Sequence, residues 1–248
     1  MEWATQFYKQ QFLLSKMEYE GMSHSYYLDE VEKISEQFGK PFQKILEIGA
    51  GVGFLANALA SQGKNVTTIE LVDELVAFAK KNSTAPVHIL CGDFYEIDVP
   101  GPFDCILYID GFGVGEDTDQ LRLLKRIYHW LKDDGYALID IYEPNYWRHI
   151  YKGEMMPVEN SSVTRQYDFD ENTGRFSDTW WLRENEADKL TQSLKCYTLQ
   201  QIHTLCQQAN LDIVGYFPGG EMNFETWSYY EPASLDYCIS YRIKLKKK

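Results

Sequence analysis

Residues 45–54 read ILEIGAGVGF, an apolar run that passes directly into a turn with three glycines. Gly49, Gly51 and Gly53 let the backbone turn sharply and let a ligand lie against it, because no Cβ stands in the way. A helix that begins after such a turn presents free N–H groups, which suit an anionic group of a ligand. The stretch therefore predicts a strand, a ligand-binding turn and a helix, in that order.

A glycine-rich turn of this kind also occurs in dinucleotide-binding folds. Three details of this sequence differ from the dinucleotide-binding pattern. The glycine spacing is G-x-G-x-G, whereas the dinucleotide fingerprint G-x-G-x-x-G needs Gly or Ala where this chain has Phe54. Glu47 stands two residues before the first glycine, where a buried strand normally carries an apolar side chain. Glu70 ends the next apolar run, where its carboxylate can accept hydrogen bonds from both hydroxyls of a ribose. These details weigh against an NAD(P)- or flavin-dependent oxidoreductase, which remains the alternative.

Strand-like and helix-like segments alternate around this stretch. Such alternation favours a parallel sheet with helices on both faces. The expected strands cover residues 42–48, 66–70, 87–91, 103–109 and 135–142, and the expected helices cover residues 52–62, 72–82 and 121–131.

The pattern changes after residue 143. Two β-type runs, residues 163–169 and 175–183, flank an Asp/Asn/Gly-rich turn and predict an antiparallel hairpin. The chain then returns to an α/β pattern, with a helix expected over 198–209 and strands over 211–217 and 237–245.

Five segments, in order and spacing, resemble the motifs of class I S-adenosylmethionine (SAM)-dependent methyltransferases. Residues 45–54 resemble the first motif of that family, and Glu70 matches the acidic residue after its second strand. Residues 91–94 (CGDF) resemble the segment after the third strand. Residues 103–110 (FDCILYID) resemble the fourth-strand motif, and residues 130–139 (WLKDDGYALI) the stretch before the fifth strand.

The resemblance covers residues 42–143 well and residues 198–217 more weakly. Asp133 and Asp134 replace the usual Pro-Gly, as a turn variant. Residues 110–113 (DGFG) lack the Asp/Asn-Pro-Pro-aromatic cluster of enzymes that methylate nucleobase amino groups, and the chain has no Pro-Cys pair like that of cytosine C5 enzymes. These departures count against DNA and RNA as acceptors.

The resemblance and the segment pattern together predict an α/β fold. We expect a Rossmann-like, seven-stranded, mostly parallel sheet with helices on both faces, an N-terminal helical lid and an inserted antiparallel β-hairpin. The expected divisions are residues 1–40 for the lid, 41–143 for the SAM-binding core, 144–196 for an antiparallel β cap over the substrate, and 197–248 for the completion of the core sheet.

The resemblance implies SAM as the methyl donor, S-adenosylhomocysteine as its product, and roles for particular residues. Glu47 would reach the ammonium group of the methionine end, directly or through water, and Glu70 would bind the ribose. Asp93 and Phe94 would hold the adenine, unless Asp93 caps a turn and Phe94 belongs to the core. The expected cofactor-binding residues are Glu47, Gly49, Ala50, Gly51, Gly53, Glu70, Leu71, Asp93, Phe94, Ile109 and Asp110.

The acceptor side offers fewer signals. Asp110 and His24 are the candidate catalytic bases, but Asp110 can equally bind the donor's ammonium group or cap a turn, and His24 can face solvent. Aromatic and arginine side chains near the insertion are candidates for the acceptor pocket, with cross-strand pairing on a hairpin surface as the alternative. These pocket candidates are Tyr142, Tyr146, Trp147, Arg165, Trp181 and Arg183.

Charge and composition narrow the class of partner. The 248 residues include 37 acidic and 24 basic side chains, a formal net charge of -13 that disfavours binding to nucleic acid. Five scattered cysteines without metal-ligand spacing predict no metal site and indicate a reducing cytoplasm. There is no signal-peptide pattern and no run of about 20 apolar residues.

We therefore expect a cytoplasmic methyltransferase, a monomer or homodimer without membrane partners, that methylates a nitrogen or oxygen atom of a small-molecule acceptor. The alternative within the same family is a SAM-binding protein that methylates a protein partner or has no catalytic activity.

Overall fold

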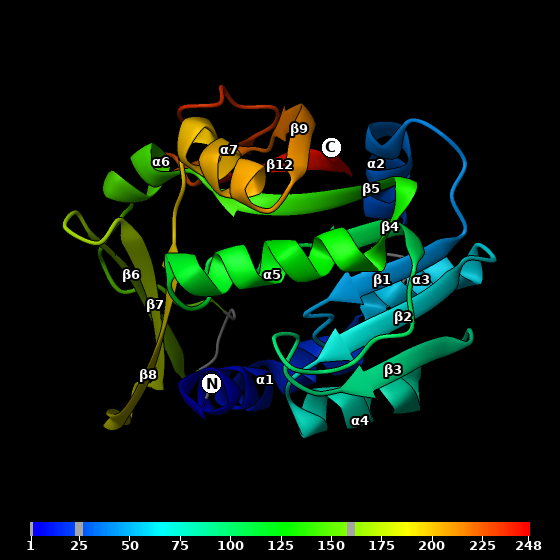
Figure 1. Cartoon of the computed structure of the whole chain (residues 1–248). Coiled ribbons are helices and arrows are strands. Elements are labelled where there is room, and N and C mark those ends of the chain that lie inside the picture. The colour runs from blue at the N-terminus through cyan, green and yellow to red at the C-terminus, as the bar shows by residue number, and fades with distance from the viewer. Residues whose placement is uncertain (1, 23–26, 158–161) are drawn as a thin grey trace.

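The computed structural model describes residues 2–22, 27–157 and 162–248, and within these ranges no helix is long and apolar enough to cross a membrane. A main sheet, a smaller antiparallel sheet and a short hairpin are present (Figure 1). The elements are α1 (Glu2–Gly21), α2 (Leu28–Phe38), β1 (Lys44–Ile48), α3 (Phe54–Ser61), β2 (Asn65–Glu70), α4 (Asp73–Asn82), β3 (Val87–Cys91), β4 (Phe103–Tyr108), α5 (Asp117–Trp130), β5 (Leu131–Tyr142), α6 (Pro144–Arg148), β6 (Val163–Asp170), β7 (Arg175–Leu182), β8 (Asn185–Lys195), α7 (Leu199–Gln208), β9 (Leu211–Pro218), β10 (Glu221–Asn223), β11 (Ser228–Tyr230) and β12 (Ser240–Lys247).

The main sheet has seven strands in the order β3-β2-β1-β4-β5-β12-β9. β12 runs antiparallel to β5 and β9, and the other neighbouring pairs are parallel. Strand order reverses between β1 and β4, because the chain first builds β2 and β3 on one side and then β4 and β5 on the other. Open α/β sheets bind ligands at the carboxyl ends of the strands at such a reversal. The expected seven-stranded, mostly parallel sheet is confirmed.

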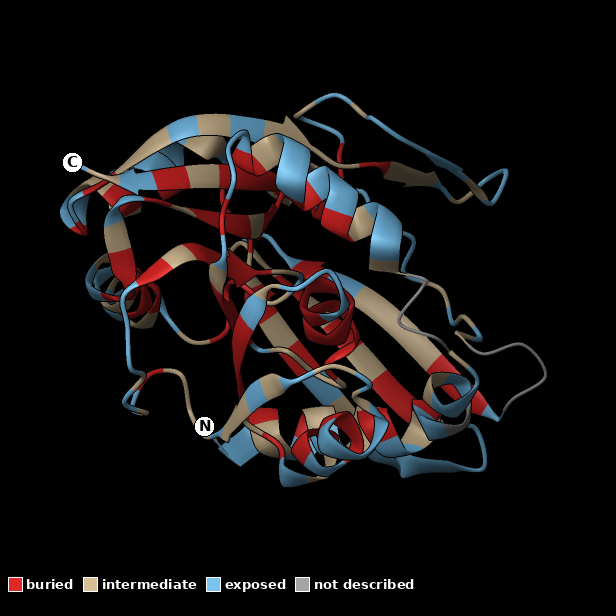
Figure 2. Cartoon of the chain, turned by 90° about the vertical axis from the view of Figure 1, so that its right-hand side faces the viewer, coloured by how far each residue is buried: buried red, intermediate tan, exposed pale blue. Residues whose placement is uncertain are grey.

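Helices cover both faces of the main sheet, and alternate residues of β1 face two different cores. Leu46 and Ile48 pack in the core that also contains residues of α5 and α7. Ile45 packs in the opposite core, with Val31 of α2 and Leu55 of α3. Buried residues line the contacts between these helices and the sheet (Figure 2). The two faces are thus closed by different helices, as the alternating pattern predicted.

The inserted segment forms a three-stranded antiparallel sheet, β6-β7-β8, which we term the cap sheet. The expected two-stranded hairpin was therefore incomplete. β6 and β7 occupy the two predicted runs, but β8 adds a strand whose first five residues, NEADK, are polar or small and exposed. Such a run carries no apolar alternation by which a strand can be recognised. The short elements α6, β10 and β11 were also missed.

The predicted N-terminal helical segment contains two helices with different positions. α2 packs beside α3 on the main sheet, whereas α1 runs from the cap sheet to α4 (Figure 1). Phe7 of α1 packs with Val163 and Trp180 of the cap sheet. Phe12, further along α1, packs edge-to-face on Phe78 of α4, with ring centroids 5.5 Å apart. α1 therefore joins the cap sheet to the core.

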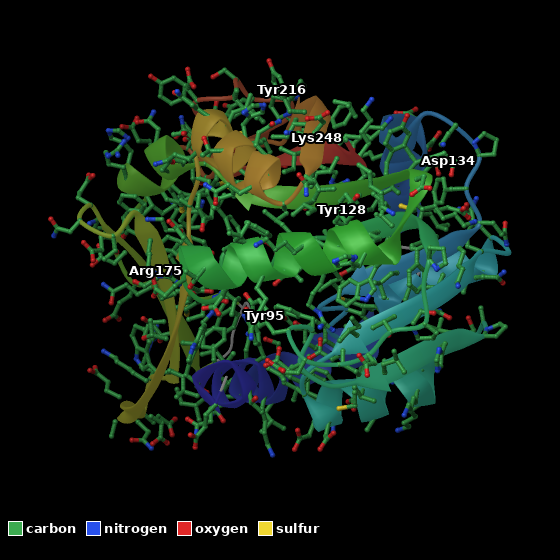
Figure 3. All side chains as sticks on the ribbon, in the orientation of Figure 1. Tyr95, Tyr128, Asp134, Arg175, Tyr216 and Lys248 are labelled. Carbon is green, nitrogen blue, oxygen red and sulfur yellow. The ribbon has the colours of Figure 1, made fainter. Side chains whose placement is uncertain are left out.

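The loop after β4 makes a second connection between the cap sheet and the core, in addition to α1. Arg175, the first residue of β7, is labelled in Figure 3. It donates hydrogen bonds to the carbonyl oxygens of Gly113 (3.2 Å) and Gly115 (2.8 Å). The N–H of Lys195 donates to the same carbonyl of Gly113 at 3.0 Å. Gly113 has a φ of +115°, and a Cβ there would lie 2.5 Å from the oxygen of Lys195. Glycine is thus required where the two sheets meet.

Arg242 of β12 ties α2 to the main sheet. Its side chain is largely buried and donates to both carboxylate oxygens of Asp140 on β5, at 2.6 and 3.1 Å. From α2, Gln37 accepts a hydrogen bond at 3.0 Å and Glu30 forms an ion pair at 2.8 Å. Removing the cation from such a cluster leaves partly buried carboxylates without compensation.

We predict that Arg242→Met lowers the free energy of unfolding by about 2–4 kcal/mol, measured by urea denaturation. Arg148→Met is the matched control, because the ion pair of Arg148 with Glu171 is exposed and should contribute about 1 kcal/mol or less. Equal losses in the two variants would contradict a stabilising role for the buried cluster.

Candidate cofactor and acceptor site

A cavity of about 780 Å³ lies where the strand order reverses. Its walls come from the segments that follow β1, β2, β3 and β4, from one face of α1 and from the start of α2. Its volume falls within the range of small-molecule sites. The fold therefore supplies a ligand site at the position expected for an open α/β sheet.

The glycine turn after β1 forms one wall of this cavity. Gly49, Gly51 and Gly53 all have left-handed backbone angles, with φ of +66°, +56° and +75°. A Cβ on Gly49 would approach the ring of Tyr108 to 3.3 Å, and one on Gly53 would lie 2.9 Å from Ala79 Cβ. At Gly51 a Cβ would meet nothing within 4 Å. Gly49 and Gly53 thus let the turn pack closely, while Gly51 leaves open space at the cavity.

Glu70, the last residue of β2, holds the glycine turn in place. Its Oε2 accepts a hydrogen bond from the N–H of Gly51 at 2.8 Å, and its Oε1 accepts one from the N–H of Val72 at 2.9 Å. Burial raises the pKa of Glu70, and these backbone donors oppose the rise. A carboxylate has about four lone-pair positions, more than these backbone donors occupy, so Glu70 can still accept a hydrogen bond from a hydroxyl group of a ligand in the cavity.

Glu47 is a buried acid that borders the cavity. Its side chain is 5% exposed, and among the described residues its Oε2 has no hydrogen-bond partner. Burial, and next the charge of Glu70, raise the pKa of Glu47 to about 8, although the N–H of Ala56 opposes the rise. A cationic ligand group beside this oxygen would compensate the buried charge. The site therefore favours a ligand with an ammonium group at this end of the cavity.

The segment after β3 contributes an aromatic ring to the wall. Phe94 borders the cavity and packs on Tyr95 and Tyr108, with ring centroids 4.6 and 5.5 Å apart. Asp93 does not border the cavity, and its Oδ1 accepts a hydrogen bond from the N–H of Tyr95 at 2.8 Å. Asp93 therefore caps a turn, as the alternative interpretation expected, and its role toward adenine remains a prediction.

Asp110 follows β4 in a left-handed conformation, with a φ of +56°, which is uncommon for residues other than glycine. Asp110 borders the cavity and keeps accessible surface, although the protein surrounds its carboxylate closely. Tyr142 donates a hydrogen bond to its Oδ1 from behind the wall. Burial raises the pKa of Asp110, and the bond from Tyr142 opposes the rise. The carboxylate therefore lies at the cavity surface, within a protein environment that disfavours its charge.

The structure brings most of the expected cofactor-binding residues together. Gly53 and Asp93 lie outside the cavity wall, in the same two turns as residues that border it. The expected residues that border the cavity are Glu47, Gly49, Ala50, Gly51, Glu70, Leu71, Phe94, Ile109 and Asp110.

The six residues expected in an acceptor pocket do not border this cavity. Trp147 stacks on Phe176 of the cap sheet with ring centroids 3.9 Å apart, because large rings form the core of this small sheet. Arg165 makes two hydrogen bonds of 2.8 Å to the buried Asp178. Of the others, Tyr142 contacts Asp110, Tyr146 packs edge-to-face on Trp147, Trp181 is buried under Lys189, and Arg183 is exposed.

One face of α1 supplies wall residues that the sequence analysis did not name. Tyr8, Phe12 and Tyr19 border the cavity and are separated by four and seven residues, the spacing of one helical face. That spacing was the available signal, although it cannot show what the face packs against. The candidate base His24 lies outside the described residues.

Comparisons with known proteins agree with this geometry. Residues 45–135 match a family described as a methyltransferase domain. Over 140 residues the chain is 27% identical to a putative methyltransferase of Geobacillus sp. (strain WCH70), covering 54% of this chain and 57% of that protein. The chain spans about half the length of the curated relatives it matches, at 57%, 51% and 49%.

Two solved structures share the fold over nearly the whole chain. A SAM-dependent methyltransferase from Clostridium acetobutylicum ATCC 824 has a TM-score of 0.71 at 15% identity, over 96% of this chain and 98% of that one. SAM-bound CalS10, an amino pentose methyltransferase from Micromonospora echinaspora involved in calicheamicin biosynthesis, has a TM-score of 0.64 at 16% identity, over 94% and 95%.

The fold places a cavity at the strand reversal, with two buried acids, Glu47 and Glu70, on its wall. Residues 45–135 are those of a methyltransferase domain, and the whole fold is shared with solved SAM-dependent methyltransferases, whose cofactor is SAM. The unpartnered oxygen of Glu47 and the open space at Gly51 fit the methionine end of that cofactor. The oxidoreductase alternative is not supported.

We predict that S-adenosylhomocysteine binding at pH 7 releases close to one proton per ligand. Glu47, with a pKa of about 8, is mostly protonated in the ligand-free protein and ionises beside the ligand's ammonium group. The release should fade above pH 8, where Glu47 is already ionised. Calorimetry in buffers of different ionisation enthalpy measures it, and Glu47→Gln should abolish it. Equal proton release by both proteins would contradict this assignment.

Proposed function

We propose that the protein transfers the methyl group of SAM to a nitrogen or oxygen atom of a small-molecule acceptor. The observation that carries the proposal is the buried oxygen of Glu47, which has no described partner and borders a cavity built on the glycine turn of a methyltransferase domain. An ammonium group at one end of the ligand supplies the missing partner.

The chain's own residues would hold the donor from three sides. Glu47 would bind the ammonium group, Glu70 the ribose hydroxyls, and Phe94 would offer its ring to the adenine. Bound SAM supplies a methyl group on a positively charged sulfur. Methyl transfer is an in-line displacement, so the protein's task is to align the acceptor with the methyl carbon and to exclude water.

The aromatic face of α1 suits this task. Tyr8, Phe12 and Tyr19 line the cavity from α1, and the cavity volume of about 780 Å³ suits a small acceptor beside the donor. Aromatic rings near a sulfonium also stabilise its charge. The amino pentose acceptor named for CalS10 supports a small molecule. The net charge of -13 continues to disfavour nucleic acid.

We predict that the purified protein binds S-adenosylhomocysteine with micromolar affinity in calorimetric titration and does not bind NADH. Glu70→Ala should weaken this binding about tenfold or more, because the ribose loses its hydrogen-bond acceptor. Asp134→Ala is the control, since Asp134 is an exposed acid at the N-terminal end of β5, near the opposite end of the strand from the cavity (Figure 3).

Two results would contradict the proposal at different levels. Failure to bind S-adenosylhomocysteine, or preference for NADH, would remove the cofactor assignment. Binding without methyl transfer to any member of a panel of small amines, alcohols and carboxylates would favour a protein acceptor or a protein that binds SAM without catalysis.

A further inference from the structure

A chain of hydrogen-bonded polar groups, buried at Asp178 and Gln192, runs from the cap sheet to the cavity wall. The hydroxyl of Tyr8 on α1 donates to the amide oxygen of Gln192 on β8 at 3.1 Å. The amide nitrogen of Gln192 donates to Oδ2 of Asp178 on β7 at 2.9 Å. Asp178 is fully buried, and its two oxygens also accept the paired hydrogen bonds from Arg165 on β6.

This chain determines which way the Tyr8 hydroxyl points. A guanidinium group only donates hydrogen bonds, and an ionised carboxylate only accepts them. Asp178, beside Arg165, therefore takes the N–H of Gln192, which turns the amide oxygen of Gln192 toward α1. Tyr8 has one hydroxyl hydrogen and donates it to that oxygen. The lone pairs of the Tyr8 oxygen are consequently left for a ligand in the cavity.

Asp110 also presents a hydrogen-bond acceptor to this cavity. Tyr142 donates its hydroxyl hydrogen to Asp110, and the carboxylate itself has only lone pairs to offer. Tyr8 and Asp110 both line this cavity, one from α1 and the other from the loop after β4. Tyr8 and Asp110 therefore offer hydrogen-bond acceptors, with no hydrogen of their own directed at a ligand.

The charged side chains of the described cavity wall favour a cationic acceptor over an anionic one. Lys33 is its only cation, and it forms an ion pair of 2.7 Å with Glu231. The acids of the described wall are Asp29, Glu30, Glu47, Glu70 and Asp110, of which Glu30 is paired with Arg242 and two are proposed to hold the donor. An anionic acceptor would meet repulsion here, whereas a cationic one would be attracted.

We propose that Tyr8 and Asp110 bind the methyl acceptor and that this acceptor is an amine. The inference rests on the proposed methyl transfer. A protonated amine can donate one N–H to each group, an alcohol can donate only one hydrogen, and a carboxylate places lone pairs against lone pairs.

The reaction is balanced without a further reactant. The bound ammonium gives a proton to the Asp110 carboxylate, and the freed nitrogen lone pair forms a bond to the methyl carbon. The carbon–sulfur bond breaks and its electron pair stays on sulfur, which becomes neutral. The product is an N-methylammonium ion, and Asp110 later passes its proton to solvent.

Gln192, Asp178 and Arg165 are positioning residues in this scheme, because they act through Tyr8 and do not border the cavity. Tyr8 comes from α1, whereas the three residues that orient it come from the three strands of the cap sheet. The cap sheet thus influences acceptor choice from a distance.

The test uses the full chain saturated with S-adenosylhomocysteine and titrated with three probes, 2-phenylethylamine, 2-phenylethanol and 3-phenylpropanoate. These probes share a ring and differ in the polar end. We expect the amine to bind at least tenfold more tightly than either of the others. Tyr8→Phe should remove most of that preference and leave the affinity for S-adenosylhomocysteine unchanged. Tyr216→Phe, on the outer strand β9, is the matched control and should keep the preference (Figure 3).

The Gln192→Leu variant tests whether Gln192 orients the Tyr8 hydroxyl or only packs beside it. Without the amide oxygen, the Tyr8 hydroxyl is free to turn its hydrogen into the cavity, so the ratio of amine to alcohol affinity should fall. A purely structural role would weaken both probes equally. Equal affinity for the three probes, including no measurable binding of any, overturns the inference while the cofactor assignment stands. A tenfold preference for the amine that persists in both Tyr8→Phe and Gln192→Leu also overturns the inference. Failure to bind S-adenosylhomocysteine overturns the proposed function and this inference with it.

Discussion

Glu47 imposes the constraint on which the site depends, because it places an acid in a strand whose neighbours are apolar and buried. A buried carboxylate without a cation is unfavourable, and the pKa of about 8 reflects that cost. Glu70 adds a second acid and fixes the glycine turn through the N–H of Gly51. The free protein therefore holds two acids beside open space, and a cationic ligand stabilises the arrangement that it binds.

The fold could largely be predicted from the sequence because its signals are local. Most of the residues expected on the donor side border one cavity, while their roles toward a cofactor stay predictions. Most strands of the main sheet contain a short apolar run, and residues 45–54 combine the strand, the turn and the helix start in ten residues. The carboxyl ends of parallel neighbouring strands meet at one edge, so Glu47 and Glu70 had to lie near each other. β8 escaped prediction because its exposed first half lacks an apolar pattern.

The acceptor side could not be predicted in the same way, because it depends on how distant segments pack. Trp147 and Arg165 looked like pocket residues, yet one builds the core of the cap sheet and the other anchors Asp178. Tyr8 borders the cavity only because α1 crosses from the cap sheet to α4. The helical spacing of residues 8, 12 and 19 marks a shared face but does not identify its partner. In the proposed scheme, the cap sheet acts on the acceptor side through α1.

The most direct test of this account is a crystal structure of the protein with S-adenosylhomocysteine. The account predicts that the ligand's amino nitrogen lies about 3 Å from the Glu47 carboxylate, with the ribose hydroxyls on Glu70 and open space between the sulfur and Tyr8. A ligand whose amino group lies elsewhere, with Glu47 still unpartnered, would contradict the claim that the buried acid defines the cofactor site.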